Sequence, residues 1–273
     1  MYKRQGEAAC WDLHGFNRLG GNSVAETVVA GMIVGEFIAD FCDSAENDIN
    51  VSAGLARDFL RHEQAKLDTL LSNTGNENPN SLRAEMQNIM TDKVGIFRSG
   101  EPLAKAVDEL QVLLERSRNI RVDYKTLAAN PELVSAYRTK LMLKLAITVA
   151  YGALQRTESR GAHFREDYPQ RNDTQWLNRT LACWKNQDET LPSLSYETLD
   201  IMKMELPPGW RGYGDKYYIA HPDSEKRQQE IEQIKQTMSS KDRFTIHETL
   251  MPYTHQLPKR YQGRNERIDE SLP

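Results

Sequence analysis

The chain has 273 residues, of which 39% are hydrophobic and 27% are charged. At roughly 100–200 residues per domain, this length allows one large domain or two to three smaller ones. The apolar content is high enough for packed cores and excludes a fully disordered chain. The 35 basic and 39 acidic residues give a formal net charge of −4, which argues against a strongly basic nucleic-acid-binding protein.

Cysteine content and hydropathy narrow the class further. Cys10, Cys42 and Cys183 are widely spaced and odd in number, so we expect free thiols, with neither a disulfide framework nor a bound metal. The longest apolar run, residues 141–154, is about 14 residues long and includes Lys144, whereas a spanning helix needs about 20 apolar residues. We therefore expect no membrane-spanning segment and no secretory signal. This indicates a cytosolic or membrane-peripheral protein.

The beginning of the chain suggests a piece of a longer polypeptide. Residues 1–5 are polar and without pattern, and a dense motif follows immediately from Gly6. Natural N-termini are usually frayed and expendable, so a functional motif this close to the end is unexpected. We expect the chain to be a fragment of a longer polypeptide; the alternative is a short tail on a complete protein.

Residues 23–42 predict an amphipathic helix. Ser23 and Glu26 have the spacing of a capping box. In this motif the serine hydroxyl accepts a hydrogen bond from the amide of residue 26, and the Glu26 side chain reaches back to the amide of Ser23. Gly31 and Gly35 lie on one side and predict close packing against another backbone, despite the low helix propensity of glycine. The apolar positions repeat every four residues: Val29, Ile33, Phe37 and Phe41.

From 51 to 157 the pattern is helical almost throughout. We expect one helix over about 51–71, a loop over 73–80, a helix around 82–90, a helix opened by Gly100, and a helix from Asn130 to about 155. The apolar positions that define the third of these helices are Leu103, Val107, Leu110 and Leu114. Asn130 supplies an N-cap and is followed by a proline and an acid. Short loops between long helices predict an up-and-down bundle.

The helical pattern of the sequence ends at residue 157. Residues 158–169 form a charged loop, 180–184 and 195–204 are strand-like, and 223–238 predict a surface helix. His163, Arg160, Arg165 and Asp167 in the charged loop are expected to be structural, holding the helical domain against its neighbour.

The segment that carries chemistry is HGFNRLGGNS, residues 14–23. A glycine pair lets the backbone approach a ligand closely, and the helix start behind it offers amides and a positive dipole end. Arg18 can grip a carboxylate with two parallel hydrogen bonds. These residues predict an anion-binding loop; an ordinary glycine turn with a solvated arginine remains the alternative, and His14 is expected to order the loop.

This string resembles the flavoprotein subunit family of fumarate reductases and succinate dehydrogenases. Phe16 and the following VAETVVAGM, residues 24–32, are more similar to the epsilonproteobacterial fumarate reductases than to other branches. A second signature is ESRGAHFREDYP, residues 158–169, with Trp176 shortly after it. The strings LPPGWRGYG and YQGRNER, residues 206–214 and 261–267, are similar to the C-terminal region of that branch. The resemblance covers residues 6–273.

The resemblance implies a mixed, mainly α fold in three parts. Residues 1–45 would be the C-terminal remnant of an FAD-binding α/β domain, 46–175 a helical bundle domain, and 176–273 a small α+β domain. The flavin fingerprint, the histidine that attaches FAD covalently and the proton-donor arginine of the family lie upstream. The resemblance therefore assigns no catalytic residue to this chain, and we expect the chain alone to be inactive.

Four residues match binding positions of the family. Glu7 matches the acid that binds the FAD ribose, and Arg18 matches the arginine that holds the dicarboxylate substrate. Ser23 and Val24 match the helix start that meets the flavin ring. No metal ligand is implied, because the iron–sulfur clusters belong to a separate subunit.

The implied function is interconversion of fumarate and succinate by hydride transfer from FAD, as part of electron transport in anaerobic respiration. The implied partners are an iron–sulfur subunit and a membrane anchor subunit, with the flavoprotein peripheral on the cytoplasmic side of the inner membrane. A succinate dehydrogenase running the reverse direction is the alternative within the class. A non-catalytic helical interaction fragment is the alternative outside it.

Overall fold

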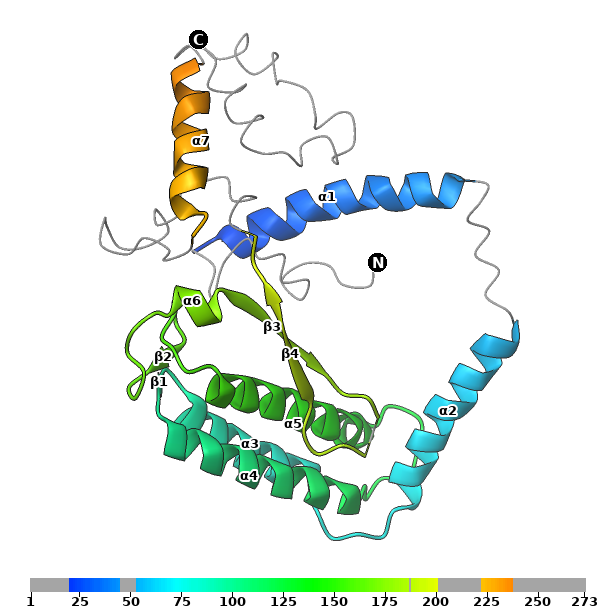
Figure 1. Cartoon of the computed structure of the whole chain (residues 1–273). Coiled ribbons are helices and arrows are strands. Elements are labelled where there is room, and N and C mark those ends of the chain that lie inside the picture. Colours follow the sequence, from blue (N-terminus) through cyan, green and yellow to red (C-terminus); the bar gives the residue numbers. More distant parts are fainter. Residues whose placement is uncertain (1–19, 45–52, 187, 201–221, 238–273) are drawn as a thin grey trace. The chain divides into compact units, whose positions relative to one another are not determined.

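The computed structural model describes residues 20–44, 53–186, 188–200 and 222–237 (Figure 1). Over these residues the protein is mainly helical with two small two-stranded sheets, which matches the mixed, mainly helical class expected from the sequence. The helices are α1 (Asn22–Asp43), α2 (Ala53–Ser72), α3 (Pro79–Val94), α4 (Gly100–Arg116), the short 3₁₀ turn η2 (Ser117–Asn119), α5 (Pro131–Gln155), α6 (Asp173–Trp176) and α7 (Ser224–Thr237). The strands are β1 (Phe97–Arg98), β2 (Phe164–Arg165), β3 (Asn178–Cys183) and β4 (Ser193–Thr198).

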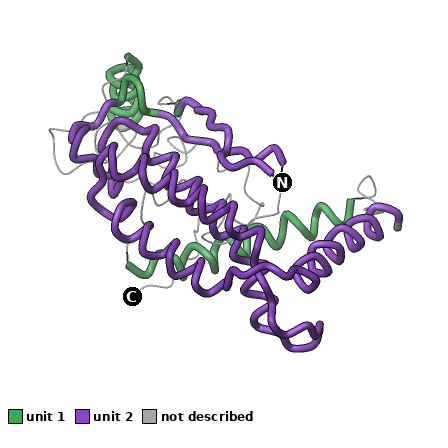
Figure 2. The backbone as a smooth tube through the Cα atoms, turned by 90° about the horizontal axis from the view of Figure 1, so that it is seen from below, with its two compact units in different colours: residues 1–48, 173–177, 199–273 green, residues 49–172, 178–198 purple. Residues whose placement is uncertain are grey.

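The chain divides into two compact units (Figure 2). The first consists of residues 1–48, 173–177 and 199–273, and the second of residues 49–172 and 178–198. The three-part division at 45 and 175 stays a prediction. No helix in the described part of the chain combines the length and apolar character that crossing a bilayer requires.

Helices α3, α4 and α5 form the core of the second unit. Their apolar residues recur every three to four positions, and this spacing places them on one face of each helix. The four positions predicted for α4 are all buried, and α2 adds Leu67, Leu70 and Leu71 to the same core. The C-terminal ends of α3 and α5 and the N-terminal end of α4 lie at the same end of the core, where they bond to β1 and to the loop of residues 156–172. Helix α4 therefore runs opposite to its two neighbours. The helices predicted around 82–90, from Gly100 and from Asn130 are confirmed as α3, α4 and α5, and for these three the alternating direction is confirmed as well.

Asparagine side chains start two of these helices. The Asn130 side chain accepts a hydrogen bond from the Leu133 amide at 3.0 Å, as the sequence predicted. Asn78 caps α3 in the same way, accepting from the Asn80 and Ser81 amides. The predicted loop over 73–80 is therefore too long, because Pro79 already belongs to the helix.

The antiparallel β3–β4 hairpin lies beside α5 (Figure 1). Its connecting loop is fixed to the helix by Trp184, whose indole nitrogen donates to the Thr148 hydroxyl at 3.0 Å. The Lys144 ammonium lies 4.4 Å from the centre of the same indole ring. The predicted strands are confirmed over 180–183 and 195–198, whereas 201–204 lie outside the described residues.

Helix α1 of the first unit begins differently from the prediction. It starts at Asn22, and Gly21, with φ of 79°, occupies the N-cap position without a side-chain cap among the described residues. Ser23 therefore lies inside the helix, and the capping box it was expected to form with Glu26 is wrong. The left-handed backbone of Gly21 turns the chain into the helix without help from a side chain.

The predicted faces of α1 are also only partly realised. Val34 and Glu26 are buried, whereas Val28, Val29 and Met32 are more than half exposed. A Cβ atom placed at Gly31 or Gly35 would meet no atom of the described residues within 4 Å. The predicted close backbone packing at these glycines is therefore absent from the described part of the structure. Helix α7 confirms the predicted surface helix and buries Ile231.

Candidate functional site

Of the predicted ligand loop, only residues 20–23, which lead into the start of α1, lie within the described residues. Ser23 and Val24 occupy its first turn, and the Val24 amide donates to the Gly21 carbonyl at 3.2 Å. A Cβ placed at Gly20 or Gly21 would meet no atom of the described residues within 4 Å, so none of these residues covers the backbone before the helix. The first amides of an α-helix lack carbonyl partners within the helix and lie at the positive end of its dipole. This arrangement suits a negative or electron-rich group.

Glu7, His14 and Arg18 lie outside the described residues. The structure therefore brings together Ser23 and Val24, which are neighbours on α1, and leaves the roles expected for the other three as predictions. Among the described residues, histidine, cysteine and acidic side chains do not gather in groups of three or more that could hold a metal ion.

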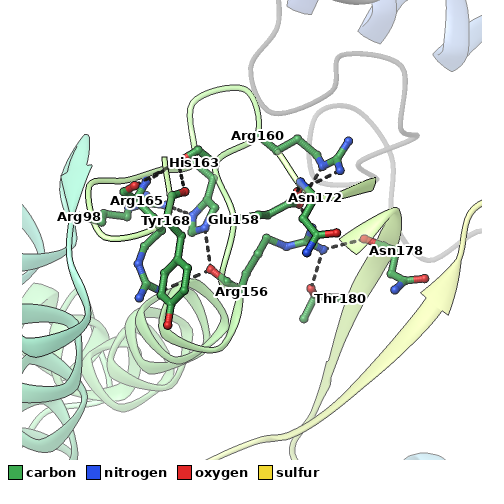
Figure 3. Close-up of polar contacts among 11 residues, drawn as sticks. Arg98, Arg156, Glu158, Arg160, His163, Arg165, Tyr168, Asn172, Asn178 and Thr180 are labelled. Carbon is green, nitrogen blue, oxygen red and sulfur yellow. Dashed lines mark hydrogen bonds and ion pairs between the residues drawn. The ribbon is translucent and has the colours of Figure 1, made fainter. Parts of the chain in front are cut away.

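A second polar cluster lies at one end of the helical core, where residues 156–172 meet β1 (Figure 3). We call it the charged lock; its members are Arg98, Arg156, Glu158, Arg160, His163, Arg165 and Asp167. All seven belong to the second unit, and they come from the ends of α5, β1 and β2 and from the loop between them.

Glu158 is the wholly buried acid of the charged lock. Its Oε1 accepts from Arg156 at 2.6 Å and from Arg160 at 2.8 Å. Its Oε2 accepts from Arg160 at 3.0 Å and from the Asn172 amide at 2.9 Å. The Arg156 guanidinium also donates to the Asn178 carbonyl at 2.6 Å, which ties the first residue of β3 to the lock. A buried carboxylate needs this number of charged donors because desolvation otherwise disfavours its ionised form.

Arg165 is the buried cation of the charged lock, with a side chain only 2% exposed. One of its terminal nitrogens, Nη1, donates to the carbonyls of Ala153 and Leu154, both at 2.9 Å, at the end of α5. Its other two nitrogens form a fork on Asp167, with distances of 2.7 and 2.8 Å. A guanidinium at a helix C-terminus satisfies carbonyls that lack an amide partner and lies at the negative end of the dipole.

Asp167 extends the charged lock to α4. Its Oδ2 accepts from the amide of Gly100, the first residue of that helix, at 2.9 Å. The hydrogen bonds from Arg165, together with that from Gly100, hold the pKa of this carboxyl at about 2. Asp167 therefore stays ionised near neutral pH and places a negative charge at a helix N-terminus.

His163 and Arg98 join the lock to α3. Arg98 donates through Nε to the carbonyls of Val94 and Gly95, at 3.0 and 2.9 Å, where α3 ends. Its Nη1 lies 2.8 Å from Nδ1 of His163, which is buried. The adjacent strands β1 and β2 pair in parallel, with Phe97 opposite Phe164.

These contacts describe what the charged lock can do. Four guanidinium groups face two carboxylates, so the lock has an excess of positive charge. Its bonds run to one another and to helix-end carbonyls and amides, an arrangement that orders backbone. The structural role expected for His163, Arg160, Arg165 and Asp167 agrees with these contacts inside one unit; their expected action on a neighbouring domain stays a prediction.

Sequence reasoning missed Arg98, Arg156 and Glu158 as members of the lock. For Arg98 a signal was present, because a basic residue close behind a helix end commonly bonds to the last carbonyls. Arg156 follows the last residue of α5 and carried the same signal.

Comparison with known proteins gives the chain its relatives. The family model described as "Fumarate reductase flavoprotein C-term" matches residues 83–213. The fumarate reductase flavoprotein subunit of Helicobacter pylori is 50% identical over 268 residues, 97% of this chain and 37% of the relative. The succinate dehydrogenase flavoprotein subunit of Bacillus subtilis is 32% identical over 207 residues, 76% of this chain and 35% of the relative.

A solved structure agrees with these sequence matches. A chain of the E. coli quinol fumarate reductase matches with a TM-score of 0.67 and 33% identity, over 75% of this chain and 34% of that chain. The chain thus spans little more than a third of the length of the curated relatives. Over the residues it shares with them, the chain belongs to the flavoprotein subunit family of fumarate reductases and succinate dehydrogenases and corresponds to its C-terminal part.

Proposed function

We propose that the chain supplies the C-terminal part of a flavoprotein that interconverts fumarate and succinate. The observation that supports this most strongly is the 50% identity to the H. pylori fumarate reductase flavoprotein subunit, sustained over 97% of the chain. Identity of this extent covers the ligand loop of residues 14–23 as well as the helical core.

The start of α1 has the electrostatic character that fits the edge of a flavin. A helix of 22 residues, before which an added Cβ at Gly20 or Gly21 would meet no atom of the described residues within 4 Å, presents its positive dipole end to the electron-rich edge of an isoalloxazine ring. In this proposal Ser23 and Val24 hold that edge and Glu7 binds the ribose hydroxyls. FAD, when bound, supplies the hydride that converts fumarate to succinate.

Arg18 holds the dicarboxylate in this proposal. Its planar fork can grip one carboxylate with two parallel hydrogen bonds, which fixes the substrate's orientation as well as its position. A substrate held at near-attack distance reacts without first losing rotational freedom.

The proposed partners are an iron–sulfur subunit and a membrane anchor subunit, with the flavoprotein peripheral on the cytoplasmic side of the inner membrane. The similarity to a chain of the E. coli quinol fumarate reductase supports assembly into a quinone-linked complex. A succinate dehydrogenase is the second candidate, supported by the B. subtilis relative at 32% identity.

A chimeric subunit tests the proposal. Residues 6–273 replace the matched C-terminal part of the H. pylori subunit, and the chimera is assayed for bound flavin and for oxidation of a reduced dye by fumarate. We expect flavin retention and fumarate reduction. A soluble, folded chimera with bound flavin and no turnover of either dicarboxylate would favour the non-catalytic interaction fragment.

Arg18→Lys in the active chimera sharpens the test. Lysine keeps the charge but loses the fork, so we expect retained flavin and a loss of at least ~10²-fold in kcat/KM for fumarate. Arg61→Lys on α2, where the arginine side chain is 77% exposed, is the matched control and should change nothing. Glu7→Gln should weaken flavin retention more than turnover per bound flavin. Near-normal kcat/KM in Arg18→Lys would assign Arg18 to ordering of the loop.

A further inference from the structure

The bonding of His163 fixes which nitrogen carries its hydrogen. Arg98 lies 2.8 Å from Nδ1, and a guanidinium has donors only, so Nδ1 must accept. The hydrogen of the neutral ring is then on Nε2, which lies 3.2 Å from the carbonyl oxygen of Arg156 and donates to it. Only the neutral Nε2–H form of the ring satisfies both partners.

This imidazole connects two helix ends. On one side, Arg98 bonds to the carbonyls of Val94 and Gly95 at the end of α3. On the other side, Arg156 is the C-cap residue of α5, and its carbonyl receives the Nε2–H bond (Figure 3). The ring is buried, so water does not readily replace either contact.

Protonation is incompatible with this arrangement. It would place a second donor, Nδ1–H, against the donating guanidinium of Arg98, and it would set two positive charges side by side. The charged groups around the ring come from every element packed against it: Arg98 of β1, Arg165 of β2, Arg156 at the end of α5, and Glu158, Arg160 and Asp167 of the loop. The two acids already hold arginines and leave the cations in excess.

We propose that His163 is an acid-sensitive latch, whose neutral ring ties the end of α5 to Arg98 of β1, which in turn bonds to the end of α3, and whose protonation releases the loop from β1. This device belongs to the helical unit and holds whatever reaction the chain takes part in. The parallel β1–β2 pairing, in which the Glu166 amide donates to the Arg98 carbonyl at 2.8 Å, opens with the latch.

Electrostatics sets the direction of the response. Burial, followed by the nearby arginine charges, lowers the pKa of His163 below its ordinary value of 6.5, against an opposing contribution from the Arg156 carbonyl. The unfolded chain therefore takes up the proton first as the pH falls through that ordinary value. The stability that the latch adds is complete above it and is lost in more acidic solution.

Two measurements on the full chain test the latch. Nitrogen NMR of ¹⁵N-histidine-labelled protein should show His163 as the Nε2–H tautomer, titrating below the ordinary range of histidine. Hydrogen exchange of the Glu166 amide, corrected for its intrinsic rate, should lose at least ~10-fold of its protection between about pH 7.5 and about pH 5. An Nδ1–H tautomer, or titration at or above the ordinary range, would overturn the proposal.

Variants separate the latch from other acid effects. In His163→Gln the side chain stays neutral, so the protection of the Glu166 amide should vary less than ~2-fold over the same pH range. His62→Gln on α2, an exposed histidine, should keep the full response. An unchanged acid response in His163→Gln would contradict the latch. Should His163→Gln fail to fold, His163→Asn and the wild-type NMR titration decide in the same way.

Discussion

The two ends of the α3–α4–α5 core are both held by charged side chains, but in different surroundings. At one end is the charged lock, in which Glu158 is fully buried and the Arg165 side chain is 2% exposed. At the other end is the Arg116 clamp, in which Arg116 at the end of α4 makes forked contacts with Glu77 and Glu85. The Arg116 side chain is 36% exposed and that of Glu85 is 44% exposed.

This difference determines what each set of charges contributes. Exposed ion pairs gain little over their hydrated state, because water and salt screen them. In a buried network the loss of one partner leaves the others desolvated and uncompensated, which is costly. We infer that losing any one buried partner of the charged lock removes most of the stability that the lock gives to its end of the core. The stability of the other end depends more on backbone contacts than on the Arg116 clamp.

The largest expected effect is at the centre of the lock. Glu158→Gln preserves the shape of the side chain but leaves Arg156 and Arg160 without their buried counter-charge, so we expect a loss of about 3–5 kcal/mol in the free energy of unfolding. Urea unfolding of the full chain, followed by circular dichroism, measures it. Glu85→Gln in the clamp is the matched control, with an expected cost below about 1 kcal/mol. Equal costs at the two positions would contradict the comparison.

At the clamped end we expect a glycine to matter more than the charges. A Cβ at Gly75 would lie 2.0 Å from the carbonyl oxygen of Asn119, a backbone atom that has little room to move. That same carbonyl accepts from the Glu77 amide at 3.0 Å, so displacing it also breaks a bond of the parallel bridge between Glu77 and Ile120. Gly75→Ala should therefore destabilise the chain by about 1–3 kcal/mol.

The control for this substitution is Gly152→Ala in α5. A Cβ there would meet nothing within 4 Å, so the gain in helix propensity should stabilise the chain by about 0.5–1 kcal/mol. Thermal unfolding of both variants shows whether Gly75→Ala lowers the stability of the chain while Gly152→Ala raises it. A neutral Gly75→Ala would mean that the Asn119 carbonyl is not held in place.

The parts of the fold that the sequence predicted are those with local causes. The buried face of α4 follows from the spacing of Leu103, Val107, Leu110 and Leu114. The start of α5 follows from Asn130, since a cap involves residues only three positions apart. The failed cap at Ser23 has a local cause as well, because Gly21 makes a positive-φ entry that competes with side-chain capping.

The parts that could not be predicted depend on residues far apart in the chain. Strands β1 and β2 have two residues each, too few for any periodicity, and their partners are 67 positions apart, as in Phe97 and Phe164. The sequence showed that the 158–169 loop is charged, but not that Arg165 would bond to the end of α5 or that Asp167 would bond to Gly100. For the ligand site, the motif supplied the residues, and only Ser23 and Val24 lie where the structure describes them.

A smaller loss of folding stability is expected when acid protonates Asp167 at the edge of the charged lock. The pKa of Asp167 is about 2 in the folded chain and 3.8 in the unfolded chain, so the unfolded chain binds the proton first as the pH falls. The stability contributed by this carboxylate is complete above 3.8 and is lost between 3.8 and about 2. Because the side chain is 35% exposed and partly screened, we expect the loss to be about 1 kcal/mol.

Comparing the wild type with Asp167→Asn isolates this contribution. The difference in urea midpoint should shrink as the pH falls through this range, since the asparagine variant has already lost the charge. Asp123→Asn, which removes an acid that is 60% exposed, is the control and should show a smaller difference at every pH. A difference for Asp167→Asn that does not change with pH would show that the carboxylate acts through shape and not through charge.

The smallest expected effect is at the exposed clamp itself. Arg116 forms a fork with Glu77 and with Glu85, and Arg116→Lys keeps the charge while losing the ability to hold both acids at once. With a third or more of the arginine side chain in water, we expect a cost of about 0.5 kcal/mol at low salt.

Because the Debye length falls from about 10 Å at 0.1 M to about 3 Å at 1 M ionic strength, the cost of Arg116→Lys should largely disappear in 1 M NaCl. The cost of Glu158→Gln should not, since its partners are shielded from solvent. Urea unfolding of both variants at the two salt concentrations makes the comparison, and a cost for Arg116→Lys that survives high salt would place the clamp on the same footing as the buried lock.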